Sequence, residues 1–517
     1  MDISFGSLGF TGLNLDINPA DLPPQVFNYG LNVEFKGSHV EPMVQESLKA
    51  AHPQAGSSIH LLESFYIVGN VLCWLACTET KAFILYMGAW YDVTPVGFLA
   101  SKKYQTTKIN GFILLNNGRQ KPFYVDIYSP LTPLVSYATW PDDLLCEVIT
   151  SLEGILIGCG VTNSSGIFNK QLVIWSDIAD PGSLPANFEF SNPASRAGFT
   201  TLEGDEFAIT AVPLENRIQL YRSFSIYDIS FVGGNSVLAF TRRQLQPNLI
   251  ARNAVAPFRR SHFGIGDGYF FEYNGFDINP LGKDVVADYF FSKVNKDRLD
   301  LITVVYDSAL DQIVVAYPEG TSDTCNRALL LDLQKKIWKH RELNTVTSLG
   351  VGFFPLASDL IAWQDLQPTW ATWDDLWAIT YNRSEKSSLV FGSSTGLFKI
   401  PNEGSPKEIA AQRLFIAFDG KDTEGSPDIK RELRKLFREC WPEVYGLVKY
   451  RLGVAESTQG TFNWGTWELF DGNSQQKTSH ILAGKYVAIE LSNNISGQLT
   501  WFRFGGFTLT AQPRGRY

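Results

Sequence analysis

Short apolar stretches alternate with Gly, Asn and Asp turns along most of the chain, which predicts strands joined by tight hairpins. In the recurring pattern an apolar strand leads to a turn, then to a second strand, and often to a Trp or Asp. About seven such units follow one another, about 40–60 residues apart. They are Phe65–Trp74, Ile109–Leu115, Leu152–Gly158 with Gln171–Asp177, Arg217–Tyr227, Phe263–Gly275, Asp311–Tyr317 with Ala328–Asp332, and Ser388–Phe398.

A repeat of this length is typical of the blades of a β-propeller. We therefore predict an all-β fold with a β-propeller of about six to eight blades. The alternative is an array of β-sandwiches with irregular spacing. Aromatic residues make up 13% of the chain and there are only 3 Met, a composition that also favours strands.

Both ends of the chain depart from the repeat. Asp16–Pro24 is stiff and extended, because each Pro fixes its own φ and biases the preceding residue away from helix. After the last unit, Gly, Pro and charged residues mark a boundary, and the strand pattern then returns. We expect three parts: an N-terminal segment (1–60), a propeller (61–405) and a C-terminal β domain (406–517).

One segment after that boundary is ambiguous. Ile429–Cys440 carries apolar residues at helical spacing, and Ser426 could cap a helix with Pro427 at its first position. The pattern alone predicts a helix here, whereas the family resemblance given below implies a strand over Leu433–Pro442.

Charge and hydropathy exclude some classes of protein. The net charge of −9 argues against a broad grip on nucleic acid, which needs clustered Lys and Arg, although it allows a protein that surrounds DNA without holding it. The longest apolar runs, such as Val71–Cys77 and Leu301–Tyr306, are far shorter than the roughly 18 residues of a membrane span. Six irregularly spaced Cys indicate reduced, buried thiols. We expect no membrane-spanning segment, no cofactor and no metal site.

Several stretches in order along nearly the whole chain resemble the tail nozzle or tail-tube proteins of short-tailed bacteriophages. The resemblance lies in Pro19–Pro24, Asn32–Gly37, Trp175–Pro181, Phe224–Tyr227, Gly266–Gly275, Trp363–Leu366, Trp373–Leu376, Gly484–Glu490, Gly505–Phe507 and Gly515–Arg516.

The resemblance implies a structural protein of the virion tail, assembled in the bacterial cytoplasm and without enzymatic activity. Propellers would stand in a homohexameric ring below a head-to-tail adaptor, with tail fibres or spikes as further partners. The terminal segments would combine into a platform, and DNA would pass along the ring axis. Candidate adaptor-docking residues are Pro19, Asp21, Leu22, Pro23 and Pro24. The alternatives are a glycan-binding or glycan-cleaving tail propeller and a propeller scaffold inside a cell.

Two glycine motifs match catalytic or binding motifs in spelling only. Gly392–Gly396 has the Gly-x-Ser-x-Gly spelling of a hydrolase elbow, but strands flank it and the only later His is His480, expected in a polar loop. Gly264–Gly268 resembles a dinucleotide loop, but no helix follows it. We expect a hairpin turn at each motif.

Acidic pairs invite a glycosidase interpretation. Asp142–Asp143 and Asp374–Asp375 are adjacent residues, which point to opposite faces of a strand, whereas glycosidases need two carboxylates at a fixed separation across a groove. We therefore expect both pairs to be surface loop residues.

The stretch from Ile229 to Gly266 contains no acidic residue. Its five arginines, here called the arginine group, are Arg242, Arg243, Arg252, Arg259 and Arg260. We expect them to be hard to neutralise locally, which predicts an interface with an acidic neighbouring subunit or a ring of Arg facing passing DNA. The alternative is that they pair with acids of the same subunit.

Overall fold

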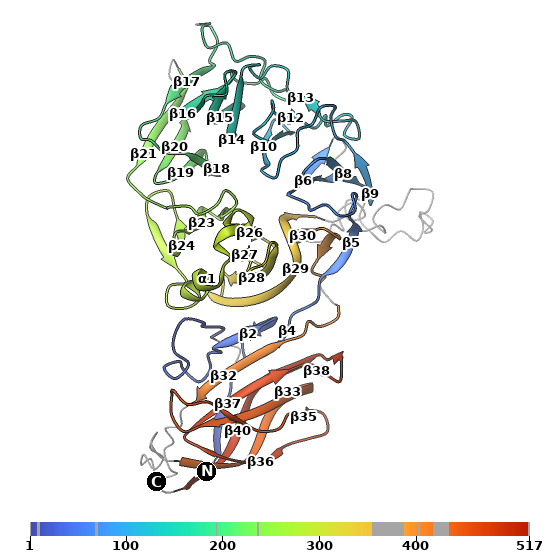
Figure 1. Ribbon diagram of the computed structural model, residues 1–517, viewed down its shortest axis with the longest axis vertical. Coiled ribbons are helices and arrows are strands. Elements are labelled where there is room, and N and C mark those ends of the chain that lie inside the picture. Colours follow the sequence, from blue (N-terminus) through green and yellow to red (C-terminus); the bar gives the residue numbers. More distant parts are fainter. Residues whose placement is uncertain are drawn as a thin grey trace, which may run out of the picture.

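The computed structural model describes residues 2–514 except 8–10, 68–70, 193, 235–236, 354–386, 402–403 and 417–433. A ring of β-sheets forms one end of the molecule and a second β domain forms the other (Figure 1). Both chain ends lie in the second domain, here called the platform domain (Figure 1).

Five separate sheets of four antiparallel strands make up most of the ring. The first two are β6 (Leu61–Ile67), β7 (Val71–Cys77), β8 (Ala82–Tyr86) and β9 (Ala89–Asp92), and β10 (Gln105–Ile109), β11 (Phe112–Asn116), β12 (Phe123–Tyr124) and β13 (Val135–Ser136). The third is β14 (Leu144–Leu152), β15 (Ile155–Asn163), β16 (Phe168–Trp175) and β17 (Gly198–Thr201). The fourth is β18 (Ala208–Leu214), β19 (Arg217–Arg222), β20 (Ile226–Phe231) and β21 (Leu238–Arg243), and the fifth is β22 (Val255–Phe258), β23 (Ser261–Gly266), β24 (Tyr269–Tyr273) and β25 (Ile278–Leu281).

Two further groups of four strands continue the ring but belong to the largest sheet. They are β26 (Thr303–Asp307), β27 (Gln312–Tyr317), β28 (Cys325–Asp332) and the start of β29 (Ile337–Gly352), then the end of β29 with β30 (Ser388–Ser393), β31 (Gly396–Lys399) and β5 (Ser47–Ala51). Strand β29 therefore serves both groups. The number of separate blade sheets, five, differs from the six to eight blades predicted.

The ring closes through its inner strands. Strand β29 contacts β6, and neighbouring inner strands contact one another at β10–β14, β14–β18, β18–β22 and β22–β26. Apolar clusters fill the space between sheets: Trp140, 1% exposed, packs with Leu114 and Ile149 between the second and third sheets. The turns have the residues that hairpins need, as at Asn110–Gly111, where both φ angles are positive (49° and 90°) in the manner of a type I′ turn. The helix α1 (Ala287–Lys293) and the short 3₁₀ helix η1 (Lys296–Leu301) join β25 to β26.

The platform domain combines strands from both ends of the chain. Its members are β1 (Asp2–Phe5), β2 (Tyr29–Leu31), β3 (Val33–Lys36), β4 (His39–Pro42), β32 (Ala410–Ile416), β33 (Arg434–Ala455), β34 (Asn463–Trp464), β35 (Glu468–Asp471), β36 (Thr478–Gly484), β37 (Tyr486–Ser492), β38 (Asn494–Ile495), β39 (Gln498–Leu499) and β40 (Phe502–Arg514). The N-terminal strands β1 and β4 pair with β40, and β2 pairs with β32.

The long strand β33 organises this domain. Its first half pairs with β40 and β36, and its second half with β37, β35 and β34. A helix over 429–440 is therefore wrong from Arg434 onward, while residues 429–433 lie outside the described residues. The reason is tertiary: Leu436, Phe437 and Cys440 are buried while the backbone pairs on both sides, so sheet packing overrides a local helical pattern.

Candidate functional site

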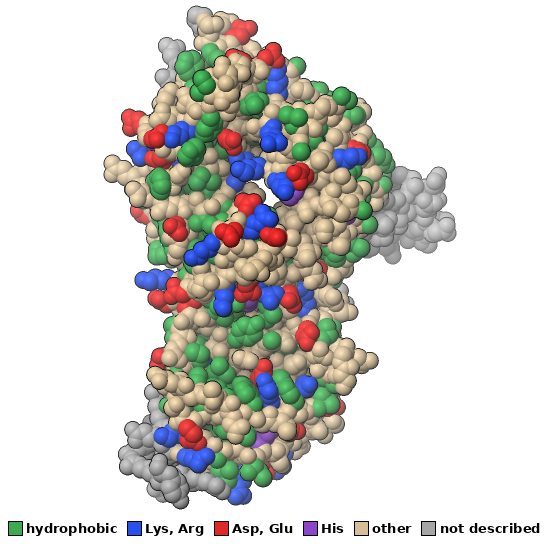
Figure 2. Space-filling view, in the orientation of Figure 1, with side chains coloured by type: hydrophobic (Ala, Val, Ile, Leu, Met, Phe, Trp, Pro, Cys, Tyr) green, Lys and Arg blue, Asp and Glu red, His purple; other side chains and the backbone are tan. Residues whose placement is uncertain are grey.

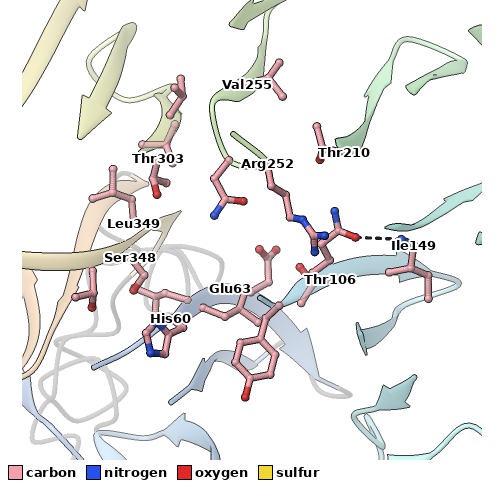
Figure 3. A pocket seen from close by; sticks show the side chains of 18 of the residues that line it. His60, Glu63, Thr106, Ile149, Thr210, Arg252, Val255, Thr303, Ser348 and Leu349 are labelled. Carbon is pink, nitrogen blue, oxygen red and sulfur yellow. Dashed lines mark hydrogen bonds between the residues drawn. The ribbon is translucent and has the colours of Figure 1, made fainter. Parts of the chain in front are cut away.

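A cavity of about 240 Å³ opens at the centre of the ring, where the inner strands begin. Residues from or next to all seven inner strands line it: β6, β10, β14, β18, β22, β26 and β29 (Figure 3). Figure 2 shows a small opening in the middle of the ring with basic and acidic side chains around it. Because inner strands present their unpaired edges and alternate side chains to the axis, a polar lining is expected.

Arg252 is the most prominent charged group in the cavity, and Figure 3 shows it and Glu63 pointing into the middle. Its Nη2 lies 3.2 Å from Glu147 Oε2, and its side chain is 19% exposed. Burial lowers the pKa of Arg252, and the neighbouring Glu147 charge opposes the shift. A guanidinium stays protonated, so Arg252 is a fixed cation with N–H groups to spare.

The other charged groups of the cavity also have partners or are neutral. Lys108 Nζ lies 2.6 Å from Glu63 Oε1. Burial, and then the charge of Lys102, lower the pKa of His60, so this imidazole is uncharged at pH 7. The cavity therefore holds nearly balanced charge.

Two hydroxyl groups of this cavity donate hydrogen bonds to backbone carbonyls and so hold the fold together. Thr303 Oγ1 donates to the carbonyl of Leu301 at 3.2 Å, and Thr347 Oγ1 donates to the carbonyl of Ile59 at 2.7 Å. Among the described residues, no hydroxyl of this cavity hydrogen-bonds to a His or a carboxylate, the arrangement that activates a nucleophile. The arrangement can bind a small polar molecule.

Duplex DNA does not fit this cavity. The major and minor grooves of a duplex are about 8.5 Å and about 7.5 Å deep, so a duplex is at least about 16 Å across. A piece about 10 Å long of a cylinder that wide fills roughly 2,000 Å³. The cavity, at about 240 Å³, is far smaller. Any DNA path must therefore lie outside the propeller ring.

The arginine group is dispersed, and each member has a carboxylate of the same chain beside it. Arg252 lies in the central cavity with Glu147. The four others pair as Arg242 with Glu206 (3.0 Å), Arg243 with Asp228 (2.8 Å), Arg259 with Asp311, and Arg260 with Glu215 (3.5 Å).

The expectation that these arginines are hard to neutralise locally is therefore wrong. Their partners are close in space but outside the stretch 229–266, so the absence of acids within that stretch misled the sequence argument. The structure favours the alternative of pairing within the subunit. A role in a subunit interface or facing DNA stays a prediction.

The candidate docking residues form a turn that wraps a buried arginine. Arg413 is 1% exposed and donates to the carbonyls of Pro19 (2.8 Å), Leu22 (2.7 Å) and Pro23 (3.2 Å). The Leu22 side chain is buried, whereas those of Asp21 and Pro23 are exposed, and Pro24 is intermediate. Docking to an adaptor stays a prediction, and only the exposed members can make it directly.

The hydrolase-like motif and the dinucleotide-like motif both lie in hairpins. Gly392–Gly396 spans the turn between β30 and β31, where Ser393 Oγ shares a hydrogen bond of 2.8 Å with Thr395. The Gly264–Gly268 motif ends in the turn between β23 and β24, with no helix after it. His480 does not lie in a loop but in β36, where it is 8% exposed and bonds to Thr478 at 2.8 Å. The sequence argument missed this because Thr478–Gly484 has too few apolar residues to look like a strand.

The structure describes only one of the two acidic pairs, Asp142–Asp143. Asp142 forms an ion pair with Lys121 on the surface. The pair Asp374–Asp375 and the segments Trp363–Leu366 and Trp373–Leu376 lie outside the described residues.

Sequence reasoning missed a buried charged cluster where the ring meets the platform domain, here called the waist cluster. Glu46 Oε1 lies 2.7 Å from Arg341, and its Oε2 lies 3.0 Å from Lys407; all three side chains are at most 7% exposed. Burial raises the pKa of Glu46, but Arg341 and Lys407 together outweigh it and hold the pKa below its usual value. Figure 2 shows further acidic and basic side chains on the surface between the ring and the platform domain. A usable signal was the charged run Lys339–Glu342 directly after Ile337 and Trp338 in a strand.

The described residues contain no cluster of three or more His, Cys, Asp or Glu able to hold a metal ion. In the same part of the chain, none of the helices is both long and apolar enough to cross a membrane.

No protein-family model and no curated protein matches the sequence. Similar solved structures include BBS1N in complex with ARL6DN, soaked with mercury, at 11% identity and a TM-score of 0.41, covering 70% of this chain and 99% of that one. Another is the Neurospora crassa Pan2 WD40 domain, at 8% identity and a TM-score of 0.38, covering 70% and 98%. The assignment of an all-β fold with a β-propeller arrangement rests on the strand pairing itself.

Proposed function

We propose that this chain is a ring-forming nozzle or tail-tube subunit of a short-tailed bacteriophage, placed below the head-to-tail adaptor as part of the DNA ejection conduit. One observation carries the proposal: both ends of the chain meet in a single β domain at one end of the propeller, where β1 pairs with β40 and β2 with β32. The sequence resemblance implies this arrangement for a platform that faces an adaptor. Several copies side by side would then leave an axial hole wide enough for DNA.

The narrow central cavity supports this placement of the DNA path. Because a duplex does not fit within one propeller, the conduit is formed between copies of the chain, in the homohexameric ring that the sequence resemblance implies. The two four-stranded groups joined by β29 act in this proposal as a sixth and a seventh blade, so that the seven units of the sequence each supply one.

Electron microscopy of the purified full chain, alone and with the adaptor ring, tests the proposal. We expect rings with an open axial hole once the adaptor is present. A deletion of residues 1–24 should abolish joining, and the double variant Asp21→Lys, Pro23→Ala should weaken it without disturbing the buried Leu22. Ser394→Ala, in a propeller hairpin, is the matched control. Single particles without rings in the presence of adaptor would overturn the proposal, and normal joining by the deletion variant would exclude the N-terminal segment as the docking surface.

A second candidate function, glycan binding by a tail propeller, is favoured by a group of exposed aromatic side chains. Phe168, at the start of β16, is 37% exposed, and Phe207 and Phe224, on the β17–β18 and β19–β20 connections, are 52% and 59% exposed. The Phe168 and Phe207 rings are nearly parallel, with centroids 6.0 Å apart. Sedimentation with host polysaccharide would separate the candidates: binding by the full chain that is lost in Phe207→Ala supports this function, and no binding excludes it.

A further inference from the structure

A second cavity, of about 320 Å³, lies between the fourth and fifth sheets, where the inner strand β18 ends. It is on the face of the ring opposite the mouth of the central cavity, because that cavity opens where the inner strands begin. Three turns enclose it: β18–β19, β22–β23 and β24–β25. Its two lining arginines, Arg217 and Arg260, come from different sheets.

Hydrogen-bond donors dominate the polar lining. Arg217 uses Nη1 on Asp228 at 3.3 Å and keeps its other N–H groups, and the Nε of Arg260 is 3.5 Å from Glu215, with the side chain 88% exposed. Asn274 Oδ1 accepts from the backbone N–H of Phe276 at 2.9 Å, which leaves the amide nitrogen available. Within the described part of the chain, no hydrogen bond uses that nitrogen. Arginine offers donors only, so this lining calls for an acceptor-rich ligand.

The charge around the cavity is positive. The lining holds two cations, Arg217 and Arg260, and one anion, Glu215, which leaves one positive charge. Asp228 is only 3% exposed and already accepts from both Arg217 and Arg243. Asp228 is therefore shared between two guanidinium groups, which leaves Arg217 only partly neutralised.

Apolar groups form the floor and one wall. Leu214 is 5% exposed beneath the cavity, and the ring of Phe276 is 65% exposed beside it. Gly275 has φ of +93°, and a Cβ there would lie 3.2 Å from Leu214, so glycine keeps this turn close to the floor. A ligand here meets donors at one end and an aromatic face at the other.

We propose that this cavity binds a small carboxylate with a ring-shaped carbon skeleton, such as a sugar acid. The carboxylate lies on Arg217 and Arg260, because planar guanidinium groups match carboxylates in bidentate pairs. The ring packs on Phe276, and the volume is at the lower end of ligand pockets, which begin at about 300 Å³. The site belongs to a single chain, so it goes beyond the proposed tail function and does not depend on ring assembly.

Isothermal titration calorimetry of the full chain with glucuronate, glucose and inorganic phosphate tests the proposal. We expect glucuronate to bind more tightly than both other probes, by about tenfold or more, since a charge-assisted hydrogen bond is lost with glucose and the ring contact with phosphate. Arg260→Gln should lower glucuronate affinity about tenfold, because this exposed side chain makes no bond that folding needs. Phe276→Ala should lower it as well.

Arg298→Gln is the matched control. Arg298 is also an exposed arginine paired with an acid, Asp323 at 2.8 Å, but it lies in η1, away from the cavity. The affinity of the Arg298→Gln variant for glucuronate should equal that of the wild type. The proposal is overturned if the folded wild type shows no glucuronate binding at about 10 mM, if glucose or phosphate binds equally well, or if Arg260→Gln binds like the control.

Discussion

Replacing Glu46 by Gln should destabilise the protein more than any exposed charge change. Glu46 holds Arg341 at 2.7 Å and Lys407 at 3.0 Å, and each side chain of this waist cluster is at most 7% exposed. The variant keeps the size of the side chain but leaves two buried cations without the carboxylate that they share. Removing one member of a buried ion pair costs about 3–5 kcal/mol. With an m-value of about 3 kcal/mol/M, the urea midpoint should fall by about 1–1.7 M.

The pH dependence gives this prediction a second readout. The pKa of Glu46 is held below its usual value in the folded chain, so its contribution is present above the unfolded pKa and is lost as pH falls through the folded pKa. The difference between wild type and Glu46→Gln should therefore be largest near pH 7 and shrink in acid. Urea unfolding followed by tryptophan fluorescence measures both.

The control and the refuting result are equally specific. Glu439→Gln removes the partner of Lys477, an exposed pair at 2.7 Å, and should cost about 0–1 kcal/mol. If Glu46→Gln unfolds at the same urea concentration as Glu439→Gln, the two cations are stabilised by something other than Glu46, and the reasoning is wrong.

Two other buried groups give predictions of the same kind. Arg413→Met leaves four backbone carbonyls, those of Pro19, Leu22, Pro23 and Leu414, without their donor at a cost of about 1–3 kcal/mol each. Limited proteolysis should therefore cut near Leu22 at least about tenfold faster while the propeller stays intact, and unchanged cleavage would contradict this. Burial lowers the pKa of His262 to about 4, from 6.5, so the neutral form stabilises the fold. The unfolded chain binds the proton first as pH falls, so the free energy of unfolding should drop by about 3 kcal/mol between pH 6.5 and pH 4. Urea titrations at each pH should show a smaller drop for His262→Gln. An identical drop would contradict the assignment.

The local pattern predicted strands and turns well, because alternation and turn residues act over a few positions. Each of the seven units lies in a different four-stranded group, for example Phe65–Trp74 on β6 and β7. The sequence did not predict that the last two groups share one strand. Strand β29 runs through both because it pairs with β28 along its first part and with β30 along its second. The number of separate sheets was wrong for that reason.

The predictions for charged residues were wrong where the partner lies far away in the sequence. Arg252 and Glu147 are 105 residues apart, so a window without acids said nothing about neutralisation. Both cavities are also assembled from several sheets, and no short motif marks them. Arg413 shows the same limit, since its acceptors lie about 390 residues earlier.

The pairing of β2 with β32 determines the order in which the two domains can be completed during translation. Leu31 pairs with Ala410, so almost the whole propeller is translated between the two strands. At roughly 5–20 residues per second, the ribosome needs about 20–75 s to cover that distance. During this interval the strands of the first 45 residues have only the β3–β4 hairpin and, once β29 is made, the pairing of Leu31 with His340. The propeller emerges and can close only in part, because its last group still awaits β30 and β31 to join the early strand β5. The platform domain is thus completed last, so a nascent chain that stalls before residue 410 carries a nearly finished ring and a leading segment whose strands β1, β2 and β4 lack their partners β40 and β32.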